Sequence, residues 1–200
     1  MTKFKSGDIF QIPLPNELGF CYAMGIILIE INPNARYPVL IRVYNYRSLN
    51  PENSIERFTD MELILSPLLI AGIIPMLTKK KWKILGNLPL RENDKIIPHY
   101  KRPEPDEVRA KDWFYLIDAD ISKKIKSTYE NVKHLETIGA IGGELVNTKI
   151  AMALLIDENK KIENYFKLEE YYEKDFLMEV NSIPAYYKLP DSMQGKALMS

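Results

Sequence analysis

Residues 20–31, FCYAMGIILIEI, are apolar at nearly every position. Successive side chains of a β-strand point to opposite faces. Because both the odd-numbered and the even-numbered positions of this run are apolar, the run predicts a strand that is covered on both faces. Gly19 and Gly25 lie beside and inside this run. Since glycine marks bulges and tight bends in strands, the stretch predicts a strongly bent sheet or a small open barrel.

The flanking segments predict partner strands for this run. Residues 7–14 form a short apolar stretch that contains Pro13, which lacks a backbone donor and suits the end of a strand. Residues 32–34, Asn-Pro-Asn, are typical of a turn, and apolar side chains then alternate with others over residues 39–44. We therefore expect three antiparallel strands in sequence.

The middle of the chain is less regular. Residues 47–62 are polar and predict a loop, whereas residues 63–90 hold apolar stretches separated by prolines and predict two further strands. Residues 91–112 combine prolines with dense mixed charge, which is typical of a linker or of a segment that wraps the domain surface. Residues 113–117, WFYLI, are too few for a helix and predict a strand.

The last third changes its hydrophobic period. The apolar residues within 144–156 predict a helix, which the two glycines at 142 and 143 precede. Tyr165, Leu168, Tyr172 and Phe176 then recur at a spacing of three to four residues, with charged residues between them. This spacing predicts a second, amphipathic helix.

Together these elements predict an α+β protein, in which an N-terminal, strongly bent antiparallel β-sheet or small open barrel packs against C-terminal helices. A chain of 200 residues can bury a core without a disulfide or a metal, so residues 1–200 are expected to form a single domain. Within it, residues 1–118 are expected to be mainly β and residues 119–200 mainly helical.

Composition excludes several function classes. The chain has 27 basic and 27 acidic residues, so it has no overall basic field, and we expect neither nucleic-acid nor membrane binding. The apolar runs, residues 68–74 among them, are far shorter than the roughly 20 residues of a membrane span. Cys21 is the single cysteine, and no signal-peptide core follows the start. A cytoplasmic location is therefore expected.

Charge is unevenly divided along the chain. Residues 61–126 hold 13 basic and 9 acidic side chains, whereas residues 127–200 hold 8 basic and 12 acidic ones. The two regions form either solvated faces of opposite sign or a charged face that binds a partner.

Asp118-Ala119-Asp120 directly follows the predicted strand at 113–117. Two carboxylates at this spacing suit Mg²⁺ or Mn²⁺ bound to a diphosphate substrate, as in metal-dependent transferases. The alternative is a turn at the end of the strand, in which the aspartate side chains bond to nearby backbone amides. Because no nucleotide-binding strand and helix units precede the motif, the turn is the preferred interpretation.

Other motifs favour structural roles. Residues 139–143, GAIGG, match no phosphate-binding spacing, and residues 79–83, KKKWK, predict a solvated turn with its tryptophan in the core. His99 and His134 lack neighbours with metal-ligand spacing, and Cys21 lies in an apolar run, where a thiol behaves as a small hydrophobe. We expect no bound cofactor and no metal.

Tyrosines on one predicted strand are candidates for contact with a partner. Tyr44 and Tyr46 share the face of Arg42, opposite Val39, Ile41 and Val43. Tyrosine is enriched at protein interfaces because it combines a large contact area with a hydroxyl group. This face is either a docking surface or a part of the core covered by other segments.

Three motifs resemble the immunity protein 26 family of bacterial polymorphic toxin systems. They are GDIFQIPLP at residues 7–15, GFCYAMG at residues 19–25 and WKILGNLP at residues 82–89, in the same order as in that family. The resemblance covers roughly residues 5–100, weakly extends through residues 113–118, and does not include residues 120–200. Ile26 departs from the basic residue that commonly follows the second motif.

The resemblance implies a cytoplasmic, non-catalytic antidote, expected as a monomer or weak dimer, that binds a cognate toxin domain and blocks it. The motif residues are of the types that set turns and packing, so recognition is expected from side chains outside them. The candidate partner-binding residues are Tyr44, Tyr46 and Arg47, joined by Asp118 and Asp120. The alternatives are an adaptor module that binds a protein or peptide, and a metal-dependent transferase that uses the two aspartates.

Overall fold

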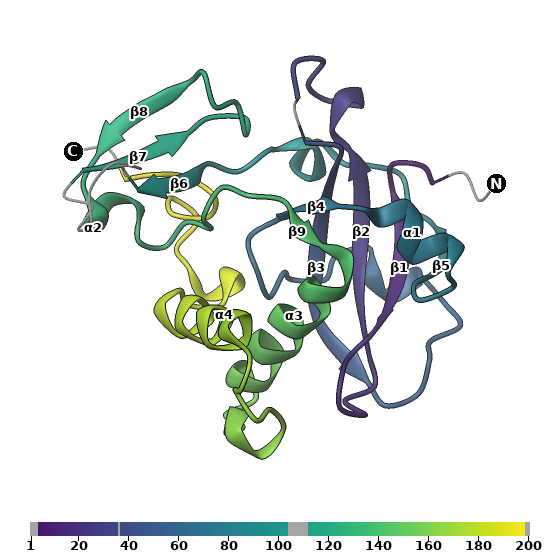
Figure 1. The fold of residues 1–200 in the computed structure, drawn as a ribbon. Coiled ribbons are helices and arrows are strands. Elements are labelled where there is room, and N and C mark those ends of the chain that lie inside the picture. Colours follow the sequence, from purple (N-terminus) through teal and green to yellow (C-terminus); the bar gives the residue numbers. More distant parts are fainter. Residues whose placement is uncertain (1–3, 36, 104–111, 199–200) are drawn as a thin grey trace.

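The computed structural model describes residues 4–35, 37–103 and 112–198, which form two β-sheets and a set of helices (Figure 1). The larger sheet has six strands in the order β5-β1-β2-β3-β4-β9, and the smaller has three in the order β6-β7-β8. Helices α3 and α4 pack beside the larger sheet, whereas the smaller sheet lies to one side of it. The predicted α+β class with C-terminal helices is therefore confirmed.

The first three strands form the predicted antiparallel meander. They are β1 (Asp8–Pro13), β2 (Phe20–Ile27) and β3 (Val39–Ser48). The second ends earlier than its apolar run, because the chain turns into the 3₁₀ helix η1 (Leu28–Glu30). The third continues two residues into the predicted loop, which includes the 3₁₀ helix η2 (Glu56–Phe58).

Gly25 allows β1 and β2 to pack closely. A Cβ atom at this position would lie 2.3 Å from the Phe10 ring, which is far inside van der Waals contact. The register shifts of the sheet lie elsewhere, between Ile9 and Phe10 on β1 and between Cys21 and Ala23 on β2. The glycine of the second strand therefore serves aromatic packing, not a bulge.

Residues 63–90 contain the two predicted strands and one helix that was not predicted. The elements are β4 (Leu68–Ala71), α1 (Ile73–Thr78) and β5 (Lys83–Asn87). Gly72 precedes the helix with φ +74°, a conformation that glycine adopts readily. The helix is short because Lys80, just after it, has φ +55°, which is not helical, so the sequence period is not visible over so few residues.

The larger sheet is open and mixed, so the predictions of an all-antiparallel sheet and of a small open barrel are wrong. Its last strand, β9 (Ile141–Gly142), pairs parallel to β4. The chain passes through the smaller sheet before it returns, and such a long connection permits parallel pairing. The edge strands of the larger sheet are β5 and β9, which pair only on one side among the described residues, so the sheet does not close.

The smaller sheet is antiparallel and is followed by a short helix. Its elements are β6 (Tyr100–Pro103), β7 (Trp113–Leu116), β8 (Lys124–Ser127) and α2 (Tyr129–Val132). The strand predicted at 113–117 is confirmed. Residues 91–112 were predicted to be a linker or a segment that wraps the surface. They include the 3₁₀ helix η3 (Glu92–Lys95) and β6. Residues 104–111 of this prediction lie outside the described residues.

The two C-terminal helices are α3 (Gly143–Asp157) and α4 (Tyr171–Ser182), with the 3₁₀ helices η4 (Ile162–Asn164) and η5 (Tyr186–Lys188) before and after the second. The first agrees with its prediction. The second begins later than predicted, because Leu168 has φ +55° and Glu170 is extended. No described helix is long and apolar enough to cross a membrane.

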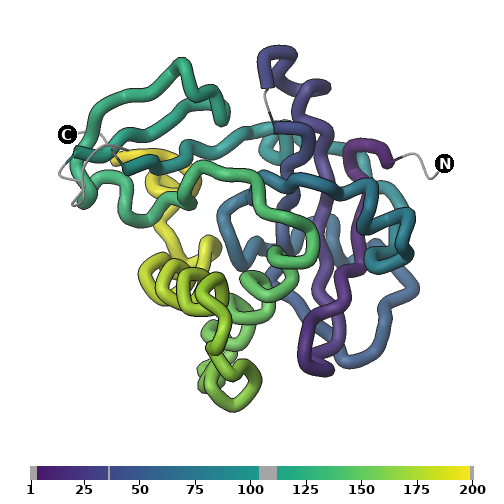
Figure 2. The backbone as a smooth tube through the Cα atoms, viewed as in Figure 1, coloured from purple at the N-terminus to yellow at the C-terminus, as the bar shows by residue number. Residues whose placement is uncertain are grey.

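A buried ionic cluster joins these helices to the smaller sheet. Lys149 of α3 lies 2.6 Å from Glu136 and 2.9 Å from Glu179 of α4. Lys101 of β6 donates a 2.9 Å hydrogen bond to the backbone oxygen of Lys133. Figure 2 shows the C-terminal segment returning to this side of the molecule, where the amide of Leu198 donates to a backbone oxygen of α2.

Candidate functional site

The two faces of β3 have different surroundings. Val39, Ile41 and Val43 belong to the core cluster that contains α3, whereas Tyr44 stacks on Phe58 of η2 with ring centroids 5.2 Å apart. The loop before β4 covers the tyrosine face, and Tyr186, which follows the C-terminal helices, also packs there. Tyr44 is 3% exposed, and burial raises the pKa of its hydroxyl.

Tyr46 lies at the edge of the same aromatic cluster and is half-buried. Its hydroxyl donates a 2.5 Å hydrogen bond to Glu52, which raises the pKa of Tyr46, and it accepts one from Arg57. The Arg57 guanidinium also lies 4.5 Å from the centre of the Tyr46 ring. A partner could reach this tyrosine through its exposed edge.

Arg47 clamps the end of β3 to the end of α3. Its Nε and Nη2 atoms donate to the two carboxylate oxygens of Glu158 at 2.6 and 2.7 Å, and its Nη1 atom donates to the Leu18 oxygen. The hydrogen bond with Glu158 raises the pKa of Arg47. A partner that contacted Arg47 would have to share it with this carboxylate.

Asp118 and Asp120 form the turn between β7 and β8. The Oδ1 atom of Asp120 accepts hydrogen bonds from the amide and hydroxyl of Ser122, at 2.9 and 2.7 Å. Lys123 lies 3.5 Å from Asp118 and 4.0 Å from Asp120, so one lysine cation lies beside both carboxylates. This arrangement is the turn that the sequence favoured. Among the described residues, no three potential metal ligands gather in one place.

The predicted partner-binding residues do not lie together. Arg47 pairs with Cys21 near the start of β2. The backbone oxygen of Asp118 accepts a 3.4 Å hydrogen bond from Asn32, which follows the other end of β2. The tyrosines and the aspartates therefore lie toward opposite ends of the sheet.

The remaining motifs have structural roles. The amide of Ala197 donates to His99 Nδ1 at 3.1 Å, and His134 Nε2 lies 2.7 Å from the Lys196 oxygen, so both histidines hold the C-terminal segment. Trp82 is buried in the core, as predicted. Cys21 is also buried, which raises the pKa of its thiol far above neutrality and keeps it protonated.

The glycine-rich stretch at 139–143 contains β9 and the first residue of α3. Glu144 follows it and forms an ion pair with Lys81, which lowers the pKa of the glutamate. The first turn of the helix thus carries an acidic side chain, which does not favour an anion there.

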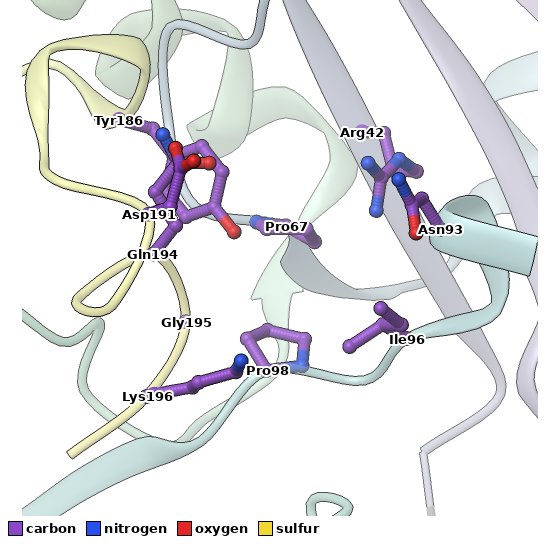
Figure 3. Close-up of a pocket in the computed structure, with 10 residues that line it drawn as sticks. All are labelled: Arg42, Pro67, Asn93, Ile96, Pro98, Tyr186, Asp191, Gln194, Gly195 and Lys196. Carbon is purple, nitrogen blue, oxygen red and sulfur yellow. The ribbon is translucent and has the colours of Figure 1, made fainter.

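A pocket of about 390 Å³ opens between the larger sheet and the C-terminal segment (Figure 3). Arg42 of β3 and Asn93 of η3 lie on one side of it, and residues of the C-terminal segment lie on the other. The lining residues are Arg42, Pro67, Asn93, Ile96, Pro98, Tyr186, Asp191, Gln194, Gly195 and Lys196. No local sequence motif indicates this pocket. Its one signal is an arginine within the apolar residues 39–43.

An ion network holds Arg42 in place. Its Nε atom lies 3.4 Å from Asp94, which is 2% exposed and accepts hydrogen bonds from the amide and Nε of Arg91 at 2.9 and 3.1 Å. Burial opposes the ionisation of Asp94, but the Arg91 hydrogen bonds and the Arg42 charge outweigh it and lower its pKa. Burial lowers the pKa of Arg42, which stays a cation because arginine does not lose its proton in proteins.

The tyrosine beside Arg42 is positioned by the backbone of η5. The amides of Tyr186 and Tyr187 donate to the oxygens of Ile64 and Leu63, at 3.0 and 3.1 Å. This pairing lays the C-terminal segment along the chain that enters β4. The pocket is thus built where three segments that are distant in sequence meet.

Comparison with known proteins identifies a family. No curated protein matches the chain, and no solved structure does. The immunity protein 26 family matches residues 5–112, a range that includes β1 to β6 and therefore five of the six strands of the larger sheet. Since this match covers more than half of the chain, the protein belongs to the immunity protein 26 family.

Proposed function

We propose that this protein is the antidote of a polymorphic toxin system, which binds one cognate toxin domain and blocks it without catalysing a reaction. The observation that carries the proposal is the family match over residues 5–112. An immunity family implies toxin neutralisation by binding. The cytoplasmic location and the monomeric or weakly dimeric state stay predictions.

The roles of the motif residues support recognition by other side chains. Gly25 packs against Phe10, Trp82 is buried, and a Cβ on Gly86 would lie 2.8 Å from Ile55. These residues form the framework of the sheet, and a framework shared within a family does not distinguish one toxin from another. Discrimination between toxins is better served by loops and segments that cover the sheet.

Two groups of predicted contact residues remain part of the proposal. The first contains Tyr46 and Arg47, with Tyr44 behind them, and the second contains Asp118 and Asp120. Because the groups lie toward opposite ends of the sheet, a standard interface of about 800 Å² per partner would centre on one of them. Tyr46 combines an exposed edge with a fixed ring, which favours the first group.

Co-expression in a bacterial host tests the function. The toxin encoded beside this protein should arrest growth when expressed alone, and simultaneous expression of this protein should restore it. The purified proteins should form a complex that elutes as one species in size-exclusion chromatography. If the toxin arrests growth equally with and without this protein, and no complex forms, the proposal is wrong for that pair.

A further inference from the structure

We propose that the pocket beside Arg42 receives an aspartate or glutamate side chain of the toxin, an inference that rests on the proposed function.

Hydrogen-bond donors dominate the lining. Arg42 has five N–H donors, and none of them forms a hydrogen bond within the described residues, although its Nε atom lies 3.4 Å from Asp94. The donors of the guanidinium are therefore left for a ligand. The side chains of Asn93, Tyr186 and Lys196 likewise have no hydrogen-bond partner within the described parts of the chain. Gln194 is different, because its Nε2 atom donates to the Leu189 oxygen. A site rich in unused donors fits a ligand that only accepts, and an ionised carboxylate is such a group.

The arginine is prepared for binding before any ligand arrives. Asp94 lies 3.4 Å from its Nε atom, and the side chain is 14% exposed, so little side-chain freedom is left to lose. Figure 3 shows Arg42 beside Asn93 on one wall, facing the C-terminal segment across the pocket. The guanidinium fork matches the two oxygens of a carboxylate, and such paired hydrogen bonds are stronger than neutral ones.

The charge of the pocket also favours an anion. Arg42 and Lys196 line it with positive charge, and Asp191 is the acidic residue in the lining. Asp94 lies behind Arg42 and is already engaged by Arg91 as well. A volume of about 390 Å³ admits one acidic side chain with its neighbouring backbone, and lies at the small end of ligand pockets.

Calorimetric titration with an inactive form of the toxin tests the pocket. Arg42→Gln should weaken binding about 30-fold or more, because truncating one partner of a desolvated charge pair leaves the other charge unpaired. Arg42→Lys should recover only part of this loss, since it restores the charge without the fork.

Lys196→Glu provides a second variant that does not depend on the Arg42–Asp94 pair. Lys196 is exposed, so the variant should fold, and the new negative charge should weaken toxin binding about tenfold. Lys161→Glu, an exposed site on the connection between α3 and α4, makes the same charge change away from the pocket and should bind as the wild type does.

A double-mutant cycle identifies the toxin group. Each surface aspartate or glutamate of the toxin is changed to its amide, and one of these changes should cost about 30-fold against the wild type but little against Arg42→Gln. Folded Arg42→Gln and Lys196→Glu variants that both bind within threefold of the wild type would overturn the pocket while leaving the proposed function intact. If the wild type neither binds nor neutralises the toxin, the proposed function fails and the pocket inference fails with it.

Discussion

On the face of the larger sheet that α3 covers, buried aliphatic side chains surround Phe10 and Trp82. The opposite face instead holds the stacked rings of Tyr22, Tyr44 and Phe58. A helix closes the first face, whereas loops and the C-terminal segment close the second and leave the Arg42 pocket. Loops tolerate sequence change better than packed helices. The loop-covered face is therefore the one on which related proteins can vary recognition without losing the fold.

The largest expected effect is on the helix-covered face. Trp82→Ala should destabilise the protein by about 4 kcal/mol, since the ring is buried and its removal leaves a large cavity. Urea unfolding followed by circular dichroism measures the change. Trp113→Ala on the smaller sheet is the control, and it should cost less because Trp113 is half-buried. Equal losses at the two tryptophans would show that the helix-covered face is not the dominant core.

The buried lysine on α3 tests whether that side of the molecule depends on packing alone. Lys149→Met should cost about 3 kcal/mol, because it leaves Glu136 buried without its cation. Burial raises the pKa of Glu136. Burial also opposes the charge on Lys149, but the attraction of Glu136 and Glu179 outweighs this effect and raises the pKa of the lysine.

Adding Glu136→Gln to Lys149→Met should recover part of that loss, since it removes the unpaired charge. The free energy of unfolding of the two single variants and the double variant, measured at neutral pH, gives the coupling. Strict additivity of the two changes would mean that the ion pair has no energetic role.

The loop-covered face is expected to respond to pH through Asp94. Folding lowers the pKa of Asp94, so the unfolded chain takes up the proton first as the pH falls. The stabilisation is therefore present above about pH 5 and is lost as the pH falls below about 4. Asp94→Asn should cost about 2 kcal/mol at pH 7, because it weakens hydrogen bonds to charged groups.

The difference between the Asp94→Asn variant and the wild type should shrink as the pH is lowered from 7 to 3. Unfolding titrations at a series of pH values measure it. Trp82→Ala is the comparison, because removing an apolar ring should give a loss that hardly changes with pH. A pH-independent loss in Asp94→Asn would contradict the ionic role of this aspartate.

The sequence predicted most of the first sheet because each of its strands carries its own local signal. Alternation over residues 39–44 was enough to separate the helix-covered side chains from Arg42 and Tyr44. The parallel strand β9 could not be predicted, since two residues of Ile-Gly carry no period. The strand β8 could not be predicted either, because its sequence, KIKS at residues 124–127, is short, charged and largely exposed.

Local sequence patterns could not predict the pocket either, for a related reason. Its walls come from β3, from η3 and from residues after α4, so its existence depends on long-range contacts. The clamp between Arg47 and Glu158 is similar, because it joins two residues 111 positions apart. The residue type alone indicated an interface at Arg47. It did not reveal that the guanidinium already donates two hydrogen bonds to the carboxylate of Glu158.

The smallest expected effect concerns this clamp, which joins β3 to the end of α3. Arg47→Gln should cost about 1 kcal/mol, as both groups are partly exposed and water screens the pair. Glu158→Gln should cost about the same, and Arg57→Gln, a more exposed arginine on the loop-covered face, should cost less.

Measurements of toxin binding then distinguish the two possible roles of Arg47, the clamp to Glu158 and a direct contact with the toxin. Glu158→Gln keeps the arginine and frees its guanidinium, so a direct toxin contact would survive in that variant and be lost in Arg47→Gln. Titration of both variants with the inactive toxin makes the comparison at equal loss of stability. Equal affinities would assign Arg47 to the clamp alone, because the toxin would then bind equally well with and without its guanidinium.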